Sequence, residues 1–509
     1  MKRALVSVSD KTGLIDFIQQ LVGLDFEIIS TGGTKKAIED AGLPVISIDE
    51  VTGFPEILEG RVKTLHPLVH GGLLAKRGNE LHDQHVAENK IGYIDLVCVN
   101  LYPFAQTIKN PNATHEEKIE NIDIGGPSML RSAAKNFNDV TVIVDAEDYD
   151  LVISELKSGE TTLKTRKMLA GKVFNHTAAY DAMIAGYFNE INEIAVPQKL
   201  TKTYEIKQSL RYGENPHQAA TFYQTQETPS YSVVASHQIH GKELSYNNIA
   251  DANAALEILS EFEKPAAVAV KHMNPCGVGL GVDVESAFDK AYEADSTSIF
   301  GGIVALNGEV TETLAEKLSK IFLEIIIAPS YAPNALEILK RKKNIRLLTT
   351  DMSDRLQPSV KLTTVKGGLL LQESDTYDVK LEDLEIVTET KPSPEDLEQL
   401  LFGFKVVKHV KSNAIAVVKE NMTIGVGAGQ MNRVGAAKIA LEQAAEKAKA
   451  SYLASDAFFP MADTVELAAS HGVKAIIQPG GSIKDQDSID ACNKLGISMV
   501  FTKVRHFKH

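Results

Sequence analysis

Cysteine is scarce in this sequence of 509 residues, and long apolar runs are absent. The three cysteines, Cys98, Cys276 and Cys492, lie far apart, which argues against a disulfide framework and favours a reducing cytoplasm. No apolar run approaches the roughly 18 residues needed to span a bilayer. The opening MKRALVSVSD moves directly into strand-like sequence, so we expect no signal peptide.

Positive charge is also in short supply. The chain has 53 Lys and Arg residues against 67 Asp and Glu residues, a formal net charge of −14. Binding to DNA, RNA or another polyanion depends mainly on basic surfaces, so such a partner is disfavoured. Small anionic ligands would need local clusters of Lys, Arg or backbone N–H groups.

The length predicts two to four domains, and the first part alternates strand and helix signals. Continuous apolar strands in βαβα order predict a parallel sheet covered by helices on both faces. Ligands of such sheets bind beyond the carboxyl ends of the strands. SVSDK, STGGT, NLYPF and DIGG all fall at such ends.

The pattern changes at VPQKLTKTYEIKQSL, where we place a domain boundary between residues 197 and 198. The remainder contains a faint internal repeat. VAVKHMNPCG at Val268 is matched with KVVKHVKSNAIAV at Lys405, which is interpreted as a second strand carrying Lys-His. Further matches pair DSTSIFGG with SDAFFPMAD, and EIIIAP with KAIIQPGG. We therefore expect two similar α/β subdomains, over about 198–365 and 366–509.

The pair Lys271-His272 has four interpretations. A zinc-deaminase site needs H-x-E and P-C-x-x-C, and this chain lacks both the glutamate and the second cysteine, so zinc is rejected. Cys276 as a thiol nucleophile is less favoured than a buried structural cysteine. His272 as a base, kept neutral by the adjacent cation, and His272 as a turn cap remain equally supported by the residues alone.

Many motifs of the second half occur in one family, in the same order. They are SLRYGENPHQAA, VKHMNPCG, IFGGIVALNGEV, EIIIAPSY, VKGGLLLQ, VKSNAIAV, IGVGAGQMNRV, SDAFFPMAD, IIQPGGSIKD and VRHFKH. The first half adds SVSDKTGL, STGGT, GRVKTLHP, NLYPF and IDIGGPSMLRSAAKN. The chain thus resembles, over nearly its whole length, the bifunctional purine-biosynthesis family that joins a 5-aminoimidazole-4-carboxamide ribonucleotide (AICAR) formyltransferase to an IMP cyclohydrolase.

The resemblance implies a methylglyoxal-synthase-like fold for residues 1–197 and two tandem cytidine-deaminase-like α/β subdomains without zinc for residues 198–509. The implied function is the last two steps of IMP synthesis. AICAR takes a formyl group from 10-formyltetrahydrofolate, and the formyl-AICAR then closes its ring with loss of water.

For formyl transfer, the resemblance implies His272 as base, Lys271 as the residue that stabilises the transition state and Asn413 as the residue that orients the reacting groups. The implied AICAR contacts are Arg211, Tyr212, Gly301, Glu324, Arg433 and Arg505. The implied folate contacts are Val434, Phe458, Asp463, Ser482 and Ile483. Two positions depart from the family pattern: Met461 replaces an aromatic residue, and Glu324 replaces an aspartate found in some relatives.

For ring closure, the resemblance implies a catalytic cluster of Lys63, Tyr102, Asp123 and Lys135. From its position alone, Lys135 would be a charge at a helix C-terminus. The implied nucleotide contacts are Ser9, Asp10, Lys11, Thr31, Gly32, Thr34, Arg61, Thr64, Asn100 and Ile124. STGGT suits a phosphate because its hydroxyls and N–H groups precede a helix.

The family also implies partners and co-substrates. We expect 10-formyltetrahydrofolate as co-substrate, no metal for the chemistry, room for a structural monovalent cation, and a cytoplasmic homodimer with shared transferase sites. The alternative class is a non-catalytic nucleotide sensor. A sensor would need the phosphate loop but not the four-residue catalytic cluster, and all four residues are present.

Overall fold

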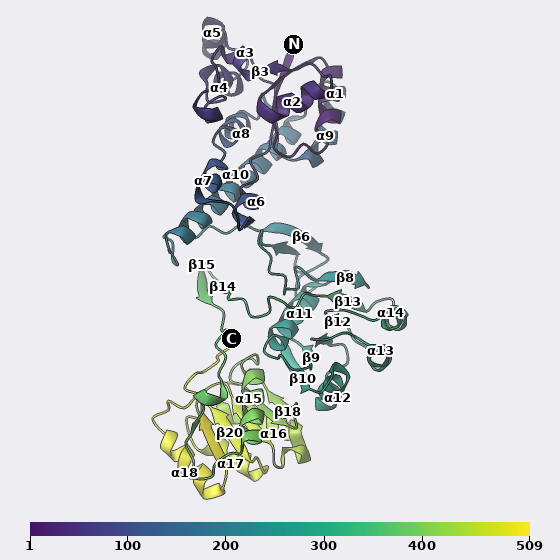
Figure 1. The fold of residues 1–509 in the computed structure, drawn as a ribbon, viewed down its shortest axis with the longest axis vertical. Helices are drawn as coiled ribbons and strands as arrows, with labels where there is room; N and C mark the ends of the chain where they lie inside the picture. Colours follow the sequence, from purple (N-terminus) through teal and green to yellow (C-terminus); the bar gives the residue numbers. More distant parts are fainter. The chain divides into compact units, whose positions relative to one another are not determined.

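A computed structural model describes residues 1–509 and divides them into two compact units, Met1–Thr203 and Tyr204–His509 (Figure 1). Each unit has its own sheets and its own hydrophobic core. No helix is both long and apolar enough to cross a membrane.

The first unit is built on a five-stranded sheet in the order β3-β2-β1-β4-β5, with every pairing parallel. Its strands are β1 (Lys2–Ser7), β2 (Phe26–Ser30), β3 (Ile46–Ser47), β4 (Leu96–Val99) and β5 (Thr141–Ile143). Its helices are α1 (Leu14–Gly23), α2 (Gly32–Asp40), α3 (Ile48–Thr52), α4 (Pro67–Leu74), α5 (Glu80–Glu88), α6 (Phe104–Lys109), α7 (His115–Glu120), α8 (Gly125–Lys135), α9 (Tyr149–Lys157) and α10 (Leu163–Ile191).

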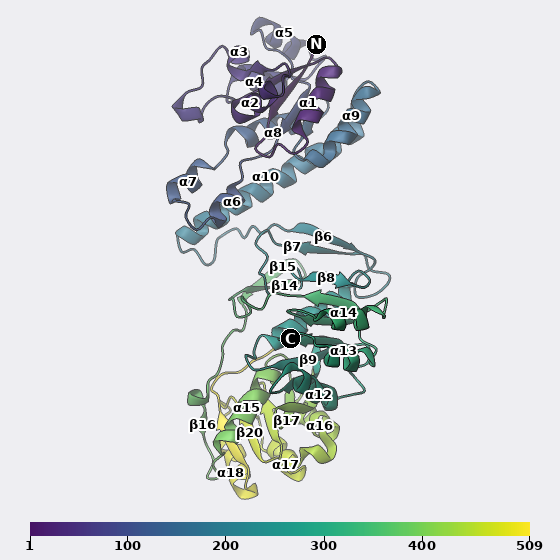
Figure 2. The same cartoon turned by 45° about the vertical axis from the view of Figure 1, so that its right-hand side comes forward.

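Both faces of this sheet are covered, which confirms the prediction from the continuous apolar strands. One core packs α1 and α9 against the sheet through Phe17 and Tyr149, whose rings stack 4.1 Å apart. The other core packs α4, α8 and the long α10 against the opposite face (Figure 2). All four residues of β4 are buried, as expected for a central strand with side chains in both cores.

The second unit is built on one mixed sheet of 12 strands, in the order β16-β21-β20-β19-β17-β18-β10-β9-β11-β12-β13-β8. The strands are β6 (Glu205–Leu210), β7 (Ala220–Gln224), β8 (His237–His240), β9 (Ala266–Lys271), β10 (Asn274–Leu280), β11 (Ile303–Leu306), β12 (Ile325–Ala328), β13 (Arg346–Thr349), β14 (Val360–Val365), β15 (Gly368–Glu373), β16 (Glu385–Ile386), β17 (Ile415–Lys419), β18 (Met422–Gly427), β19 (Tyr452–Ser455), β20 (Ala475–Gln478) and β21 (Ser498–Phe501). Two hairpins, β6–β7 and β14–β15, lie outside this sheet.

Helices cover both faces of the large sheet. They are α11 (Tyr246–Leu259), α12 (Val284–Ala294), α13 (Glu312–Ser319), α14 (Pro333–Lys340), α15 (Pro394–Val407), α16 (Arg433–Ala444), α17 (Asp463–Ser470) and α18 (Asp485–Leu495). The core on one face draws on α11 and α15, and two separate cores on the other face draw on α12 to α14 and on α16 to α18.

The strand order is symmetric about the pair β10 and β18. Outward from this centre, β9, β11, β12, β13 and β8 on one side are matched by β17, β19, β20, β21 and β16 on the other. The sequence follows: VAVKHMNPCGVG at residues 268–279 aligns with AVVKENMTIGVG at residues 416–427, which is 148 positions later. The expected pair of similar α/β subdomains is therefore present.

Two of the three sequence matches proposed for this repeat are wrong. Lys405 and the two valines after it end helix α15, so this Lys-His lies at a helix C-terminus and not on a strand. DSTSIFGG precedes β11, whereas SDAFFPMAD begins on β19 and runs beyond it. Only EIIIAP and KAIIQPGG are equivalent, since they form β12 and β20. The sequence alignment had matched the two Lys-His pairs with each other. The structure shows instead that Glu420, at the tip of the β17–β18 hairpin, is the equivalent of His272.

Glycines show how closely each central strand packs on its helix. A Cβ on Gly277 would lie 2.0 Å from the backbone oxygen of Ala291 in α12, and a Cβ on Gly427 would lie 1.9 Å from that of Ala436 in α16. No side chain fits at such a distance, so strand and helix backbones are in direct contact in both halves.

We expect Gly427→Ala to destabilise the protein by about 1–3 kcal/mol, because α16 would have to move away from β18. Urea unfolding followed by circular dichroism measures the effect. Gly186→Ala in α10 is the matched control, since a Cβ there meets nothing within 4 Å and alanine favours a helix interior. Equal midpoints for wild type and Gly427→Ala would contradict this packing.

Candidate active sites

The carboxyl ends of β1, β2 and β4 meet in the first unit and bring the predicted nucleotide contacts together. The Asn100 side chain accepts hydrogen bonds from the N–H groups of Ser9 (2.6 Å) and Asp10 (3.1 Å) and donates to the Asp10 carbonyl (2.9 Å). The Thr34 hydroxyl bonds both backbone groups of Val8 at 2.9 Å. Side chains thus fix the loop after β1 against the two neighbouring strand ends.

Helix α2 begins at this edge, and two lysines approach its first turn. Gly32 has a φ of 53°, which glycine adopts at little cost. The Lys63 ammonium lies 3.8 Å from the position of a Cβ on Gly32, and the Lys11 ammonium lies 4.0 Å from that of a Cβ on Gly33. Free N–H groups at a helix N-terminus and two cations form a local environment suited to a phosphate, in a chain that is acidic overall.

An acid–base cluster surrounds Lys63. The charge of Lys63 lowers the pKa of Asp123, but burial dominates and holds that pKa above its ordinary value. Burial also raises the pKa of Tyr102, and the nearby charges of Asp123 and Glu56 act in the same direction. Glu56 lies 3.7 Å from the Lys63 ammonium. Three of the four predicted cyclisation residues are therefore close together.

Hydrogen bonds fix the orientation of Asp123. Its Oδ1 accepts from the Gly126 N–H at 2.9 Å, and its own N–H donates to the Tyr180 hydroxyl at 2.8 Å. The Thr64 hydroxyl lies beside Gly125, 2.6 Å from the position of a Cβ there. Asp123 and Thr64 thus flank the start of α8.

The remaining predicted residues of this unit lie further out. Lys135 is exposed at the end of α8, which is about 16 Å long, so within one chain this helix separates it from Asp123. Arg61 is exposed and pairs with Glu120, and Ile124 is 57% exposed. The contributions of Lys135, Arg61 and Ile124 to a site stay predictions.

In the second unit, Lys271 and His272 lie at the tip of the β9–β10 hairpin. The Lys271 ammonium donates to the Phe300 carbonyl at 2.7 Å, and His272 is exposed. His272 and Met273 have φ values of 103° and 61°, a tight turn that two non-glycine residues rarely form. Asn274 links this tip to the other half by accepting from the Lys411 N–H at 3.1 Å.

A cavity of about 670 Å³ lies near this tip and contains several predicted AICAR contacts. Arg211 lies over the ring of Tyr212 at 5.1 Å, and Glu324 pairs with Arg346 at 2.6 Å. Gly301, next to Phe300, has a φ of 74° and bonds the Phe322 carbonyl at 2.7 Å. Lys242, Lys342, Lys343 and Arg346 also line the cavity, so a phosphate could be bound there.

Arg433 and Asn413 form a buried network in the other half. Arg433 is 6% exposed; its guanidinium pairs with Asp456 and donates to the Ala414 carbonyl (3.1 Å) and the Asn413 Oδ1 (2.8 Å). Asn413 Nδ2 donates to the Gln430 carbonyl at 2.8 Å. The Arg433 guanidinium therefore orients the Asn413 amide. A direct contact of Arg433 with AICAR stays a prediction.

The predicted folate contacts lie on the loops after β19 and β20 and at the start of α16. Gln478 joins the two loops, because its side-chain oxygen accepts from the N–H groups of Phe459 and Gly480. Ile483 and Met461 are largely exposed, and Phe458 is half-buried. Val434 is half-buried at the start of α16, Asp463 begins α17, Ser482 precedes α18, and Arg505 is exposed with its guanidinium over Phe507.

Strand directions place the transferase candidates on one edge of the large sheet. The start of β17 and the carboxyl ends of β9, β19 and β20 face the same way as the starts of β11 and β12, because β10 and β18 are antiparallel. Along this edge β9 and β17 are three strand spacings apart, about 14 Å. The predicted AICAR contacts beside β9, β11 and β12 and the predicted folate contacts after β19 and β20 thus lie along the same edge of the sheet.

Cys276 does not fit the thiol interpretation. Burial raises its pKa to about 12, and Asp295 adds to the shift, so the thiolate is negligible near neutral pH. Among the described residues, no group of three or more His, Cys, Asp or Glu side chains is arranged to hold a metal ion.

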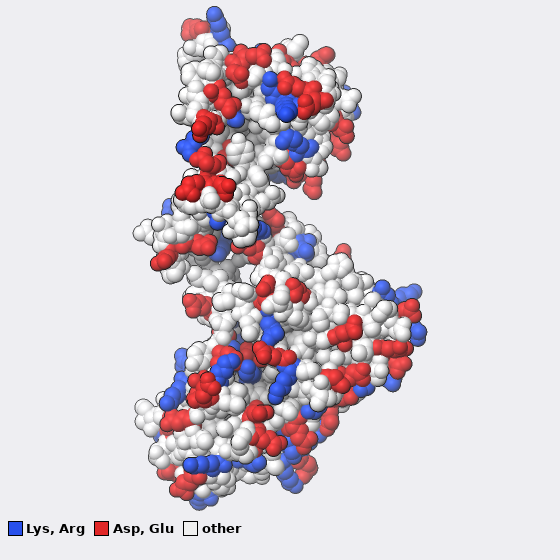
Figure 3. All heavy atoms as spheres, viewed as in Figure 1, with Lys and Arg blue, Asp and Glu red and all other residues white.

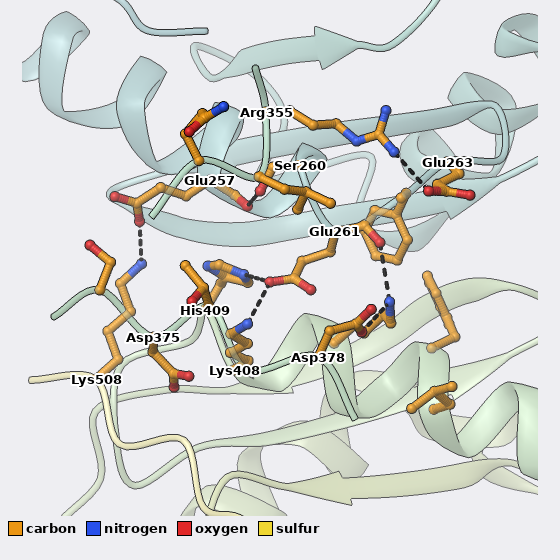
Figure 4. A pocket seen from close by; sticks show the side chains of 18 of the residues that line it. Glu257, Ser260, Glu261, Glu263, Arg355, Asp375, Asp378, Lys408, His409 and Lys508 are labelled. Carbon is orange, nitrogen blue, oxygen red and sulfur yellow. Dashed lines mark hydrogen bonds and ion pairs between the residues drawn. The ribbon is translucent and has the colours of Figure 1, made fainter. Parts of the chain in front are cut away.

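The second Lys-His pair lines a different cavity, of about 890 Å³, between α11 and α15 (Figure 4). Glu261 bonds His409 at 2.8 Å and Lys408 at 2.9 Å, and all three side chains are nearly buried. Glu257 pairs with Lys508 at 2.9 Å in the same cavity. Glu261 is the repeat equivalent of His409, so this pair stabilises the contact between the two halves.

Two charged residues at these sites were missed from the sequence. Glu56 approaches the Lys63 ammonium, and Arg346 pairs with Glu324 in the 670 Å³ cavity. Neither stands in a recognisable motif. Alignment with the correct repeat would not have found them either, since Glu56 and Lys63 meet through a loop and Arg346 and Glu324 meet where the neighbouring strands β12 and β13 begin.

Comparisons with known proteins agree with this architecture. A family model described as "MGS-like domain" matches residues 13–128, and one described as "AICARFT/IMPCHase bienzyme" matches residues 133–443. The bifunctional purine biosynthesis protein PurH of Lysinibacillus sphaericus (strain C3-41) is 62% identical over 509 residues, with 100% of both chains covered. The protein of that name from Bacillus subtilis (strain 168) is 60% identical over 510 residues, again with 100% of both covered. A solved structure, "Crystal structure of ForH", is 38% identical over 37% of this chain and 98% of that chain, with a TM-score of 0.34.

A family model over more than half of the chain and full-length relatives at about 60% identity define a bifunctional enzyme. The chain belongs to the AICARFT/IMPCHase bienzyme family. It combines AICAR formyltransferase and IMP cyclohydrolase activities, the last two steps of purine biosynthesis. The sensor alternative is set aside.

Proposed function

We propose that the two activities are divided between the two units, with ring closure in Met1–Thr203 and formyl transfer in Tyr204–His509. The observation that supports this division is the grouping of Lys63, Tyr102 and Asp123 in one unit and of Lys271, His272 and Asn413 on one sheet edge of the other. The two clusters share no element.

In formyl transfer, the AICAR amine attacks the formyl carbon of 10-formyltetrahydrofolate. His272 accepts the amine proton as the new C–N bond forms, and the bond to the folate N10 breaks as N10 takes up a proton. Lys271 and the Asn413 amide stabilise the oxyanion of the tetrahedral intermediate. The exposed position of His272 at a hairpin tip leaves its ring free to reach a bound amine.

Arg211, Tyr212 and Glu324 bind AICAR in the 670 Å³ cavity, beside the Lys271 contact with Phe300. Gly301 completes this side of the site, and Arg505 and Arg433 extend it. Val434, Phe458, Asp463, Ser482 and Ile483 bind the folate. Met461 offers it a flexible apolar surface in place of an aromatic ring.

In ring closure, the carboxamide nitrogen attacks the formyl carbon and water is lost. An amide nitrogen is a poor nucleophile, so Asp123 orients it and accepts its hydrogen bond while Lys63 and the Thr64 N–H stabilise the oxygen that leaves as water. Tyr102 holds the amide. Lys135 exchanges protons with the reacting groups. Helix α8 separates Lys135 from Asp123 within one chain, so its role has less structural support than the roles of Lys63, Tyr102 and Asp123.

The transferase site is completed by a second copy of the chain in a cytoplasmic homodimer. The β14–β15 hairpin pairs only with itself (Figure 1). The apolar residues exposed on it are Val360, Val365, Leu369, Leu370 and Leu371. An isolated hairpin is marginally stable in water, so such an apolar pair of strands needs a covering partner.

We expect Leu370→Asp to dissociate the dimer and to reduce formyl transfer while ring closure continues. Light scattering after gel filtration gives the mass, and separate assays give both activities. Leu81→Asp is the matched control, since Leu81 is 58% and Leu370 59% exposed. A dimer that persists in Leu370→Asp would show that this hairpin is not the interface.

The direct test of the proposed function uses the purified protein with AICAR and 10-formyltetrahydrofolate. The expected products are tetrahydrofolate and IMP, separated by chromatography and identified by absorbance and mass. Binding of AICAR without turnover would leave a nucleotide-binding protein and would refute the proposal. Figure 3 shows small groups of acidic and basic side chains interspersed over a mostly uncharged face, with no extended basic surface on the side in view.

A further inference from the structure

The repeat supplies an internal comparison for the His272 turn. His272 and Met273 correspond to Glu420 and Asn421 at the tip of the β17–β18 hairpin. All four residues have positive φ values, 103° and 61° in the first turn and 54° and 60° in the second. The two hairpins thus share one strained turn, and only the first carries the proposed base.

The same helix position supports both turns. Met273 N–H donates to Oδ1 of Asp251 in α11 at 2.7 Å, and Asn421 N–H donates to Oε1 of Gln399 in α15 at 2.9 Å. Asp251 and Gln399 are themselves 148 positions apart, and each follows an equivalent serine cap, Ser245 or Ser393. The structural task at this position is therefore to accept one backbone hydrogen bond.

A neutral amide performs that task in the second half. Gln399 is 6% exposed and uses its amide again, since Nε2 donates to Asn421 Oδ1 at 2.8 Å. The first half instead has a carboxylate, whose ionised form is destabilised there because burial raises the Asp251 pKa. The negative charge of Asp251 is not needed to hold the turn and is disfavoured by burial, so its presence requires another explanation.

That explanation is the neighbouring imidazole. The charge of His272 lowers the pKa of Asp251, so the two groups are within electrostatic reach. The other ionisable groups packed around this turn are Lys271 on β9, Cys276 on β10, Asp295 after α12, and Lys411, whose N–H bonds Asn274. Asp251 is the carboxylate whose own hydrogen bond holds the turn.

We propose that Asp251 is a positioning residue for formyl transfer: its carboxylate holds the His272 turn and stabilises the imidazolium that forms when His272 takes the amine proton. This inference rests on the proposed role of His272. A carboxylate beside a general base acts in the same way in hydrolytic triads, without itself accepting the proton. The second repeat needs no such charge, because Glu420 replaces the base.

Asp251→Asn tests the proposal, because asparagine keeps the Oδ1 acceptor and removes the charge. We expect kcat for formyl transfer to fall about 10-fold or more with little change in KM. Asp251→Glu should recover part of the rate. Thermal unfolding and ring closure of supplied formyl-AICAR should stay near wild type.

Asp251→Gln is the second variant, because glutamine already supports the equivalent turn at Gln399. The matched control is Gln399→Glu, which adds a charge to the other repeat and should leave kcat and KM of formyl transfer unchanged. Wild-type kcat in both Asp251→Asn and Asp251→Gln would overturn the inference. A fully active His272→Ala would instead overturn the proposed function, so the two failures are distinguishable.

Discussion

His272→Ala abolishes formyl transfer, with an expected fall in kcat of about 100- to 10,000-fold, the usual contribution of a positioned general base. The AICAR amine is a weak nucleophile because its lone pair is delocalised into the ring and carboxamide. Without a base at the β9–β10 tip, the tetrahedral intermediate cannot lose its proton in step with C–N bond formation. The measurement is the rate of tetrahydrofolate release with saturating AICAR and 10-formyltetrahydrofolate.

The same variant should close the ring of supplied formyl-AICAR at the wild-type rate, because Lys63, Tyr102 and Asp123 belong to the other unit. The substitution is on an exposed side chain, so unfolding is not expected. Loss of both activities in a folded protein, or of neither, would show that the sites are not divided between the units as proposed.

Asp123→Asn has opposite effects on activity and stability. We expect ring closure to fall at least about 100-fold, because Oδ1 of asparagine is already bonded to Gly126 and its Nδ2 donates where the second carboxylate oxygen would accept from the carboxamide. Near pH 7 the same variant should be more stable than wild type. Asparagine keeps the Oδ1 that accepts from Gly126 but loses the acceptor for the Tyr102 N–H. It also removes a charge that burial disfavours by more than these hydrogen bonds stabilise it, since the pKa of Asp123 is raised despite both.

The sign follows from the raised pKa of Asp123. A carboxyl whose folded-state pKa exceeds its unfolded value is most favourable to the fold below the unfolded pKa, about 4, and loses that contribution as pH rises through the folded value. The stability advantage of Asp123→Asn should therefore be full near pH 7 and shrink as pH falls toward about 4. Thermal unfolding at several pH values measures it, and a variant less stable than wild type at pH 7 would contradict the buried charge.

The first unit could be predicted well because its signals are local. Continuous apolar strands such as LVCV, each followed by a helix, specify a parallel sheet, and the loops after its strands mark the ligand edge. Lys63 and Asp123 gather at that edge as expected. Lys135 does not, because a helix of fixed rise lies between it and Asp123, and a motif carries no information about which end of a helix faces a site.

The second unit was harder to predict from the sequence, because its two halves share a backbone arrangement but not the same functional residues. The residues shared by the two halves include Gly277 and Gly425, which let each strand lie directly against its helix, and Lys271 and Lys419 before the turn. The sequence pattern instead suggested Lys408-His409 as the equivalent of Lys271-His272, but this second pair follows the end of helix α15 and the likeness is due to chance. Buried pairs such as Arg433 with Asp456, or Asp251 with Met273, are brought together by tertiary contacts. The spacing of these residues in the sequence therefore does not predict that they interact.

The central claim, that each unit holds its own independent site, is tested most directly by complementation. His272→Ala and Asp123→Asn are assayed separately and as an equimolar mixture, each with AICAR and 10-formyltetrahydrofolate, and IMP is measured. We predict almost no IMP from His272→Ala, formyl-AICAR without IMP from Asp123→Asn, and IMP from the mixture. A mixture that makes no IMP, or wild-type IMP from either variant alone, would contradict the account.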